Sequence, residues 1–230
     1  MYFKISNTAK MKEIERDVNA LFKYPHLYTP QIVISGLTEV SIPIVTMDDA
    51  SMITLAIWGL LPTNYNDDWE LFQKLTNTLT IPADTLETNL WYHNSFKNRR
   101  CIIPITGFFT SVLKKGEIYP YHISAKNGGI LYLAGIYTIL EDGFMTCSLL
   151  TGPLEKEIVH FQNLVDYMPI VLDRDDKAEW LSKETETTRA KEILQTPSTT
   201  ELAIRPIAKD LFNQDISYDS MLLPNDYPED

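Results

Sequence analysis

Residues 101–150 constrain the fold most strongly, because apolar, β-branched and aromatic segments alternate there with short turn signals. Each signal contains glycine beside charged residues or asparagine, a composition typical of tight hairpin turns. The pattern predicts antiparallel strands over residues 101–113, 119–124, 130–140 and 144–150. The turn signals between these strands are Lys114-Lys115-Gly116, Asn127-Gly128-Gly129 and Glu141-Asp142-Gly143.

Helices and further strands are expected on both sides of this sheet. Apolar residues three and four positions apart predict a helix from Asn7 or Thr8 to about residue 23, and a second helix that Asp67 or Asp68 caps and that extends to Leu79. Strands clustered in the middle, with helices around them, predict an α+β domain built on a curved antiparallel sheet. The other expected helices are 154–165, 175–182 and 187–194, and the other expected strands are 31–35, 54–61, 168–172 and 202–207.

The charge of the chain opposes one class of function. Lysine and arginine total 20 and aspartate and glutamate total 31, which gives a formal net charge of −11. Such a charge opposes binding to a polyanion unless the basic residues gather on one face. The composition therefore excludes a broadly basic nucleic-acid binder.

The two cysteines, Cys101 and Cys147, each lie in an apolar run. They cannot build a disulfide framework or a four-cysteine zinc site, so we expect a reducing cytoplasm and no metal or other cofactor. No stretch approaches the roughly 18 apolar residues that a spanning helix needs, so no membrane partner is expected. We also expect a monomer.

The chain ends in a segment of different composition. Residues 210–230 contain six acidic residues and no basic residue. Segments of one charge sign usually pack loosely against a domain. We therefore predict one domain over residues 1–208 and an acidic C-terminal tail over residues 209–230.

Common catalytic motifs are absent from the sequence: it has no glycine-rich phosphate loop, no His-Glu-x-x-His pair and no Gly-x-Ser-x-Gly turn. The four histidines are scattered over different predicted elements, and a lone histidine is more often structural than a ligand. His160 lies in the predicted helix before the strand at 168–172 and either faces a cleft or lies on the helix surface, the second being favoured.

One basic cluster, Lys97-Asn98-Arg99-Arg100, precedes the strand that begins at Cys101. Its arginines can clamp a phosphate through paired hydrogen bonds, or they can pair with some of the 31 acidic residues, which we favour. Nearby aromatic residues can stack on unpaired bases or belong to the core, the more common role. The DNA-binding candidates are Lys97, Arg99, Arg100 and Trp58, and the nearby aromatic residues are Trp91, Tyr92 and Phe96.

Six short motifs follow one another along almost the whole chain, and their series resembles the signature of the SRAP family, the SOS-response-associated peptidases. The resemblance implies a single α+β domain with a barrel-like, mostly antiparallel sheet flanked by helices. It also implies a shallow positive groove that binds single-stranded DNA in the DNA-damage (SOS) response. The motifs are Trp58-Gly59-Leu60-Leu61-Pro62; Glu87-Thr88 with Ser95-Phe96; Arg100-Cys101-Ile102-Ile103-Pro104-Ile105-Thr106-Gly107-Phe108-Phe109; Tyr119-Pro120-Tyr121; Leu133-Ala134-Gly135-Ile136-Tyr137; and Met168-Pro169-Ile170-Val171-Leu172 with Trp180.

The resemblance implies covalent chemistry at abasic sites. A cysteine at position two, exposed by removal of the initiator methionine, attacks the aldehyde of the abasic site, and its amine and thiol close a thiazolidine ring. An asparagine in Asn-Ala-Arg, a glutamate in Gly-Phe-Tyr-Glu-Trp and a histidine shortly before Arg-Met-Pro assist this reaction. They orient the amine, relay protons and contact the sugar.

Most of these functional positions hold other residues in this chain. Position two is Tyr2, which lacks a thiol and whose bulk is expected to keep Met1 in place. The glutamate position is Thr110, and threonine is no carboxylate acid or base. The asparagine position falls on Ala83, or on Asp84 with another anchor, and the histidine position is Val165 or His160.

These substitutions lead to three hypotheses. The first is a degenerate SRAP-like pseudoenzyme, without crosslinking or peptidase activity and with at most weak binding to single-stranded DNA. The second is an active protein that uses Lys4 or the Met1 amine to form a Schiff base, with His160 as proton relay. The third is a non-catalytic interaction module whose acidic surface binds a basic partner protein.

Overall fold

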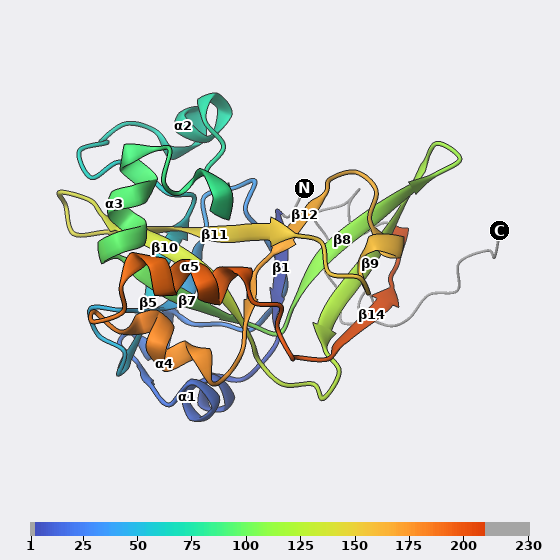
Figure 1. Cartoon of the computed structure of the whole chain (residues 1–230), viewed down its shortest axis with the longest axis horizontal. Coiled ribbons are helices and arrows are strands. Elements are labelled where there is room, and N and C mark those ends of the chain that lie inside the picture. The colour runs from blue at the N-terminus through green and yellow to red at the C-terminus, as the bar shows by residue number, and fades with distance from the viewer. Residues whose placement is uncertain (1–2, 210–230) are drawn as a thin grey trace.

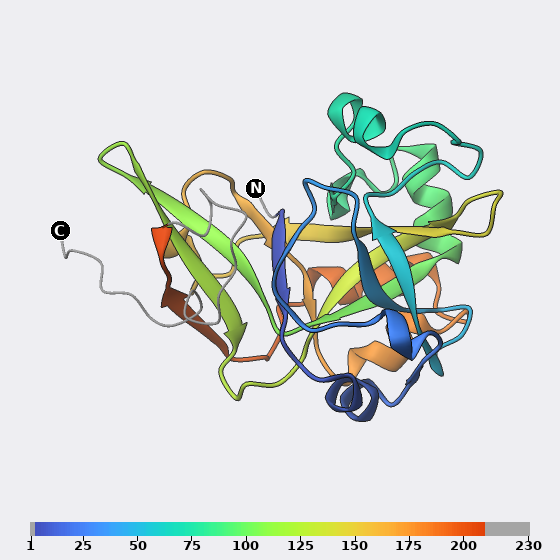
Figure 2. The same cartoon turned by 180° about the vertical axis from the view of Figure 1, so that it is seen from behind.

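The computed structural model describes residues 3–209, which fold into two β-sheets with helices packed around them (Figure 1). The smaller sheet has five strands in the order β14-β9-β8-β1-β3. Figure 2 shows the same two sheets from behind, with the small sheet at one end of the molecule. The strands of this sheet are β1 (Lys4–Asn7), β3 (Gln31–Ser35), β8 (Gly107–Lys114), β9 (Glu117–Ala125) and β14 (Leu202–Pro206).

The larger sheet closes on itself. Its order is β12-β11-β10-β7-β4-β5-β2, and an additional parallel pairing between β11 and β5 joins five of these strands into a barrel. Most of the other pairings are antiparallel, which confirms the predicted α+β class with a barrel-like sheet. The strands are β2 (Leu21–Phe22), β4 (Ser41–Thr46), β5 (Met52–Trp58), β6 (Thr80–Pro82), β7 (Arg100–Ile105), β10 (Leu131–Ile139), β11 (Met145–Pro153), β12 (Tyr167–Pro169) and β13 (Val171–Leu172).

Helices cover the outside of the barrel, with α3 and α4 packed against β7. None of the helices in the described part of the chain is long and apolar enough to cross a membrane. The α-helices are α1 (Met11–Val18), α2 (Trp69–Leu75), α3 (Leu90–Asn98), α4 (Asp176–Leu181) and α5 (Thr187–Gln195), and the 3₁₀ turns are η1 (Pro25–Leu27), η2 (Ala83–Thr85) and η3 (Val159–Phe161).

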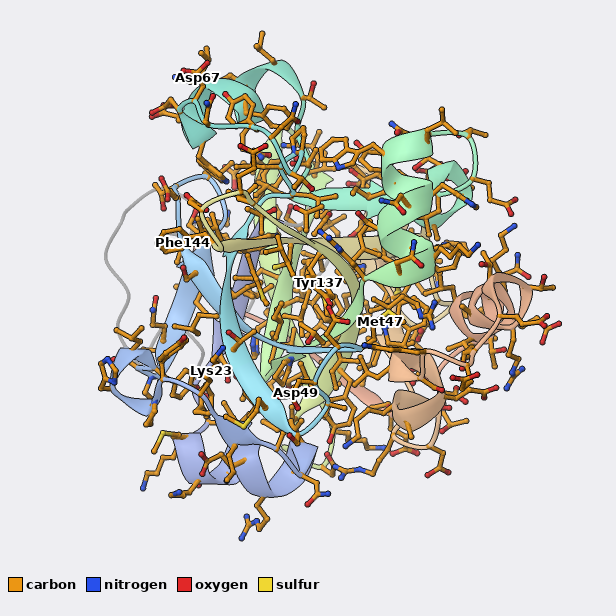
Figure 3. All side chains as sticks on the ribbon, turned by 90° about the vertical axis from the view of Figure 1, so that its left-hand side faces the viewer. Lys23, Met47, Asp49, Asp67, Tyr137 and Phe144 are labelled. Carbon is orange, nitrogen blue, oxygen red and sulfur yellow. The ribbon has the colours of Figure 1, made fainter. Side chains whose placement is uncertain are left out.

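The position of strand β7 explains why the sequence near residue 101 is continuously apolar instead of alternating between apolar and polar residues. Successive side chains of a strand point to opposite faces, and both faces of β7 are covered. Cys101 and Ile103 belong to the cluster that also contains Trp58, whereas Ile102 belongs to the cluster beneath α4, with Trp180. Figure 3 shows Tyr137 of β10 in the interior of the molecule and Phe144 at the tip of the β10–β11 hairpin.

The first predicted helix is wrong at both ends. Asn7 lies in β1, and the helix begins only at Met11, where the Lys10 amide donates to a Glu13 carboxylate oxygen at 2.8 Å. It ends at Asn19, whose left-handed backbone (φ 60°) turns the chain into β2. Apolar spacing continues beyond this point because Ala20 and Phe22 are buried, Phe22 as part of strand β2, whereas Leu21 is exposed.

The long strand predicted at 101–113 is two strands that belong to different sheets. The chain turns at Thr106 and passes from β7 to β8. For the same reason Asn127-Gly128-Gly129 is not a hairpin, since it connects β9 of the small sheet to β10 of the barrel. The turns at Gly116 and Gly143 are hairpins as predicted, and both glycines have positive φ.

The helix predicted over 154–165 is also wrong, because only η3 is helical there. The Gln162 amide donates to the nearby Tyr167 backbone oxygen, and the Asn163 amide donates to the Leu113 backbone oxygen of β8, so these two side chains hold the segment as a loop. Helix α3 and strands β4 and β6 were not predicted. The helices at 175–182 and 187–194 agree with α4 and α5, and Asp68 caps α2 as expected.

Candidate functional site

The residue at the family's glutamate position, Thr110, lies in β8 and is 5% exposed. Its hydroxyl donates to the side-chain oxygen of Gln162. The Gln162 amide in turn donates to the backbone oxygens of Val165 at 3.0 Å and Tyr167 at 2.7 Å. A hydroxyl and a neutral amide therefore occupy this position, and neither titrates near neutral pH.

The two candidates for the family's histidine lie on either side of Gln162. His160 is exposed on η3, which agrees with the favoured surface position. Val165 is half-buried and packs against the core. The side chain that contacts Thr110 is thus Gln162, a residue that the sequence reasoning did not single out.

The loop around Gln162 gives a stability prediction. Gln162→Ala removes three hydrogen bonds of a buried amide, so we expect the free energy of unfolding to fall by about 2 kcal/mol. Asn163→Ala is the matched control, because the side chain of this exposed neighbour bonds, among the described residues, only to the Leu113 backbone. Its loss is expected to cost less than about 1 kcal/mol. Urea unfolding measures both values, and equal losses would contradict the role of Gln162.

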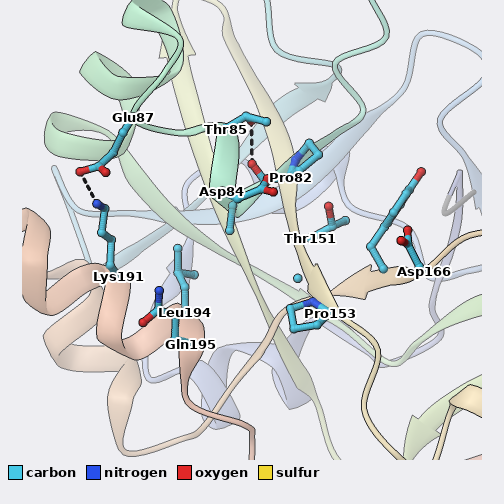
Figure 4. A pocket seen from close by; sticks show the side chains of 13 residues that line it. Pro82, Asp84, Thr85, Glu87, Thr151, Pro153, Asp166, Lys191, Leu194 and Gln195 are labelled. Atoms are coloured by element: carbon cyan, nitrogen blue, oxygen red, sulfur yellow. Dashed lines mark hydrogen bonds and ion pairs between the residues drawn. The ribbon is translucent and has the colours of Figure 1, made fainter.

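The residue at the family's asparagine position, Ala83, lines a pocket of about 800 Å³. The pocket lies between η2, the carboxyl end of β11, the start of β12 and helix α5 (Figure 4). The pocket therefore includes Asp84, the alternative candidate for the family's asparagine position. It also includes Asp166 and Tyr167, which follow Val165 in the sequence. Its lining residues are Pro82, Ala83, Asp84, Thr85, Glu87, Thr151, Gly152, Pro153, Asp166, Tyr167, Lys191, Leu194 and Gln195.

The charge of this pocket is negative. Lys191 is the one cation in its lining, and it forms an ion pair with Glu87. Asp84 and Asp166 add two carboxylates without a cation in the lining to balance them. Asp166 and burial both raise the pKa of Tyr167, burial being the larger cause. A phosphate in the pocket would thus meet net negative charge.

The basic cluster does not form a phosphate clamp. Arg100 is 0% exposed, and within residues 3–209 its guanidinium donates only to backbone oxygens. Desolvation lowers its pKa. Neither the phosphate clamp nor the favoured ion pair is found for this residue. The guanidinium of Arg100 donates to the backbone oxygens of Trp180 at 2.8 Å, Phe96 at 3.2 Å, Lys97 at 3.1 Å, Ser182 at 2.7 Å and Thr185 at 3.4 Å.

The other DNA-binding candidates are dispersed. Trp58 is 0% exposed, and its indole nitrogen donates to the Leu79 oxygen at 2.9 Å, so it offers no stacking face. Lys97 is exposed at the end of α3. Arg99 is half-buried and helps to lower the pKa of Asp48, after the larger effects of Tyr137 and Lys183. These residues are separate from the pocket.

Both cysteines belong to the hydrophobic core. Cys101 and Cys147 are both fully buried, and desolvation raises the pKa of each thiol well above its ordinary value. Thiolates are the reactive form. Among residues 3–209, no group of three or more histidine, cysteine, aspartate or glutamate side chains is placed to hold a metal ion.

A buried serine and histidine meet in the small sheet. The Ser6 hydroxyl lies 2.8 Å from Nε2 of His122, and both residues are buried. Desolvation, with a smaller effect of Arg205, lowers the pKa of His122 from 6.5 to about 4. Neither residue lines the pocket beside Ala83. The pair therefore joins β1 to β9 across β8.

The pKa of His122 predicts how stability depends on pH. The unfolded chain binds the proton near pH 6.5 and the folded chain only near 4, so the free energy of unfolding falls as the pH drops through this interval, by up to about 3 kcal/mol. Above pH 6.5 this contribution is complete. We expect His122→Gln to make the decline shallower in urea titrations, whereas the control His26→Gln, at an exposed histidine, leaves it unchanged.

Two sequence predictions lie outside the described residues: the position of Tyr2, and the acidic tail apart from Lys209. The boundary at 208/209 therefore stays a prediction. Lys4, the substitute nucleophile of the second hypothesis, is half-buried in β1. Its role as a nucleophile stays a prediction.

Solved structures share this fold. A protein from Bacteroides thetaiotaomicron superposes with a TM-score of 0.86 at 20% identity, covering 97% of this chain and 99% of that chain. A protein from Bordetella bronchiseptica gives a TM-score of 0.73 at 13% identity, covering 90% and 99%. At these identities the similarity concerns the fold alone.

Sequence relatives are described as abasic site processing proteins. YMR114C of Saccharomyces cerevisiae is 24% identical over 208 residues, which is 77% of this chain and 55% of the relative. YobE of Bacillus subtilis is 29% identical over 131 residues, 54% and 56% of the two chains. The chain thus spans little more than half the length of these relatives.

The family comparison covers nearly the whole chain. Residues 1–214 match the family described as SOS response associated peptidase (SRAP). The match includes both sheets, the helices around the barrel and the pocket beside Ala83. The chain therefore belongs to the SRAP family.

Proposed function

We propose that this chain is an SRAP protein without the covalent abasic-site chemistry, and that its contact with single-stranded DNA is at most weak and non-covalent. The observation that carries the proposal is the contact between Thr110 and Gln162. Thr110 stands at the position where the family resemblance implies a carboxylate. Neither the threonine hydroxyl nor the glutamine amide exchanges a proton near neutral pH. Without such a group, imine formation at an aldehyde lacks its acid and base.

The nucleophile of the family chemistry is missing as well. The residue after Met1 is Tyr2, and a phenol cannot close the five-membered ring that an amine and a thiol on adjacent carbons form. Ala83 at the asparagine position carries no amide to orient an amine. The buried cysteines cannot substitute, because their thiols lie in the core.

The electrostatics of the pocket support weak DNA binding. Asp84 and Asp166 line the same pocket as Ala83, and the cation Lys191 is neutralised by Glu87. Contacts to phosphate supply most of the affinity in non-specific DNA binding. A negative pocket therefore favours a basic partner over DNA, which supports the interaction module as a second candidate function.

Incubation with single-stranded DNA that carries an abasic site tests the proposal. We expect no shifted band on denaturing electrophoresis, while an SRAP relative with cysteine at position two, run in parallel, forms one. A second arm adds borohydride, which reduces an imine to a stable amine. A band that appears only with borohydride would favour the Schiff-base hypothesis through Lys4 or the Met1 amine, and a band without it would overturn the proposal.

A further inference from the structure

The small sheet has an inner face that packs into the core and an outer face with exposed apolar side chains. On the inner face, Phe108 and Ile123 belong to the core cluster that contains Trp58 of the barrel. On the outer face, Leu113 and Ile118 lie directly opposite each other on β8 and β9 and are 43% and 49% exposed. Adjoining exposed apolar side chains mark an interaction surface more often than single ones do.

The apolar surface continues along the outer face toward the middle of the sheet. Phe109 lies on this face because strand side chains alternate and it is four residues before Leu113. Ile207, just after β14, and the partly buried Val33 of β3 belong to the same small cluster as Phe109. The outer face therefore has apolar residues from the β8–β9 turn as far as β3.

The outer face is also free of acidic side chains, although the chain as a whole has a net charge of −11. Of the five strands of the small sheet, only β9 contains an acidic residue, Glu117. It lies on the inner face, because it is the neighbour of Ile118 in the strand. Arg205 is exposed and lies opposite His122, which places its positive charge on the outer face.

The described chain ends at the edge of this sheet. After β14, the Ile207 amide donates to the Pro120 oxygen at 3.1 Å. The Lys209 ammonium then binds the Glu117 carboxylate at 2.5 Å and lies 3.9 Å from the centre of the Tyr119 ring. Lys209 is thus held next to the β8–β9 turn, where the exposed apolar pair lies.

Residues 210–230 match the outer face in chemistry and length. They contain six acidic residues and no basic residue, and their first part also contains the apolar residues Leu211, Phe212 and Ile216. Neighbouring strands are about 4.8 Å apart and an extended residue spans about 3.4 Å, so about five residues cross the sheet from β9 to β3. The segment is therefore long enough to cover the face.

We propose that residues 210–230 dock on the outer face of the small sheet, with apolar side chains of 211–216 over Leu113 and Ile118 and carboxylates beside Arg205. The proposal goes beyond the proposed function and does not depend on it, because Thr110 lies on the inner face. A docked acidic segment also removes an acid-free surface from contact with DNA phosphate.

Methyl NMR of the full chain tests the proposal with a soluble paramagnetic chelate, which broadens the signals of methyl groups that solvent reaches. We expect the signals of Leu113 and Ile118 to keep their intensity, because residues 210–230 cover them. The signals of Leu71 and Leu75, exposed leucines of α2 away from the small sheet (Figure 1), are expected to broaden. Nuclear Overhauser contacts from the Phe212 ring to the protected methyl groups identify the covering segment.

Matched variants locate the docking surface on the sheet. Leu113→Ser with Ile118→Ser is expected to make chymotrypsin cut after Phe212 about 10-fold faster, because the apolar contacts that hold the segment are lost. Leu71→Ser with Leu75→Ser is the control, since it makes the same change at exposed leucines of α2. The control is expected to leave the rate of cleavage unchanged.

The reciprocal variant changes the docking segment and leaves residues 3–209 unaltered. Phe212→Ser with Ile216→Ser is expected to expose the methyl groups of Leu113 and Ile118 to the chelate. This variant keeps the proposal testable even where the serine changes in the sheet lower its stability.

The proposal is overturned if the chelate broadens Leu113 and Ile118 of the unaltered chain as strongly as Leu71. Unchanged cleavage after Phe212 in the sheet variant would contradict it as well. Overhauser contacts found only between differently labelled chains would assign the face to a second copy, and protection that appears only with single-stranded DNA would assign it to DNA. None of these results affects the electrophoresis of abasic DNA, so the two proposals fail by different observations.

Discussion

Replacement of Arg100 by methionine is expected to lower the free energy of unfolding by about 4 kcal/mol. The guanidinium is fully buried and donates to backbone oxygens in α3, in α4 and in the turn after α4. Methionine fills similar space but has no donors, so these oxygens lose their partners in the interior. Because the acceptors at 180–185 are 80 or more residues away, the loss is expected to detach α4 from β7.

The control for this prediction is Arg99→Met. Arg99 is the preceding residue and is half-buried, and its charge acts on the partly exposed Asp48. Exposed charge pairs contribute about 0–1 kcal/mol, so we expect a small effect. Urea unfolding followed by tryptophan fluorescence measures both variants. If Arg100→Met unfolds at the same urea concentration as the unaltered chain, the guanidinium does not hold α4 in place.

Trp58→Ala is expected to cost a similar amount, about 4 kcal/mol, because the side chain is fully buried between the strands of the barrel. Its indole donates to Leu79, and its backbone oxygen accepts from the Trp69 indole at 3.1 Å. A side chain added at Gly36 would come within 2.9 Å of the Trp58 ring, so the ring has no room to move aside. Trp58→Ala therefore leaves a cavity that the surrounding barrel cannot fill.

Trp91→Ala is the matched control on helix α3. Trp91 is half-buried, and its indole nitrogen has no partner in the described part of the chain. We expect a loss of about 1–2 kcal/mol, since partly exposed surface is removed. Thermal unfolding compares the two variants. A larger loss for Trp91 than for Trp58 would contradict the assignment of Trp58 to the core.

The sequence predicts local hairpins well because their signals lie within a few residues. Lys114-Lys115-Gly116 and Glu141-Asp142-Gly143 connect strands as expected, since a glycine with positive φ is needed at each turn. Asn127-Gly128-Gly129 carries the same signal but joins two different sheets. Composition specifies the turn, whereas the pairing of the strands depends on the barrel as a whole.

Arg100 shows why the site was harder to predict. An arginine pair before a strand is typical both of a phosphate clamp and of ion pairs, and neither interpretation includes backbone oxygens as acceptors. The residues that supply those oxygens are distant in the sequence. The contact of Thr110 with Gln162 likewise spans 52 residues. The order of the motifs identifies the family because the motif residues pack against one another in the fold. Gly135, for example, lies against the side chains of Cys101 and Ile103.

Intact mass spectrometry after incubation with abasic single-stranded DNA is the most direct test of the proposed loss of covalent chemistry. The mass of the unaltered chain is predicted to stay that of the protein alone, with Met1 retained before Tyr2. The same spectrum reads both points, the state of the first residue and the presence of bound DNA. A mass increased by that of the oligonucleotide would show that the chain still forms a covalent link and would contradict the proposal.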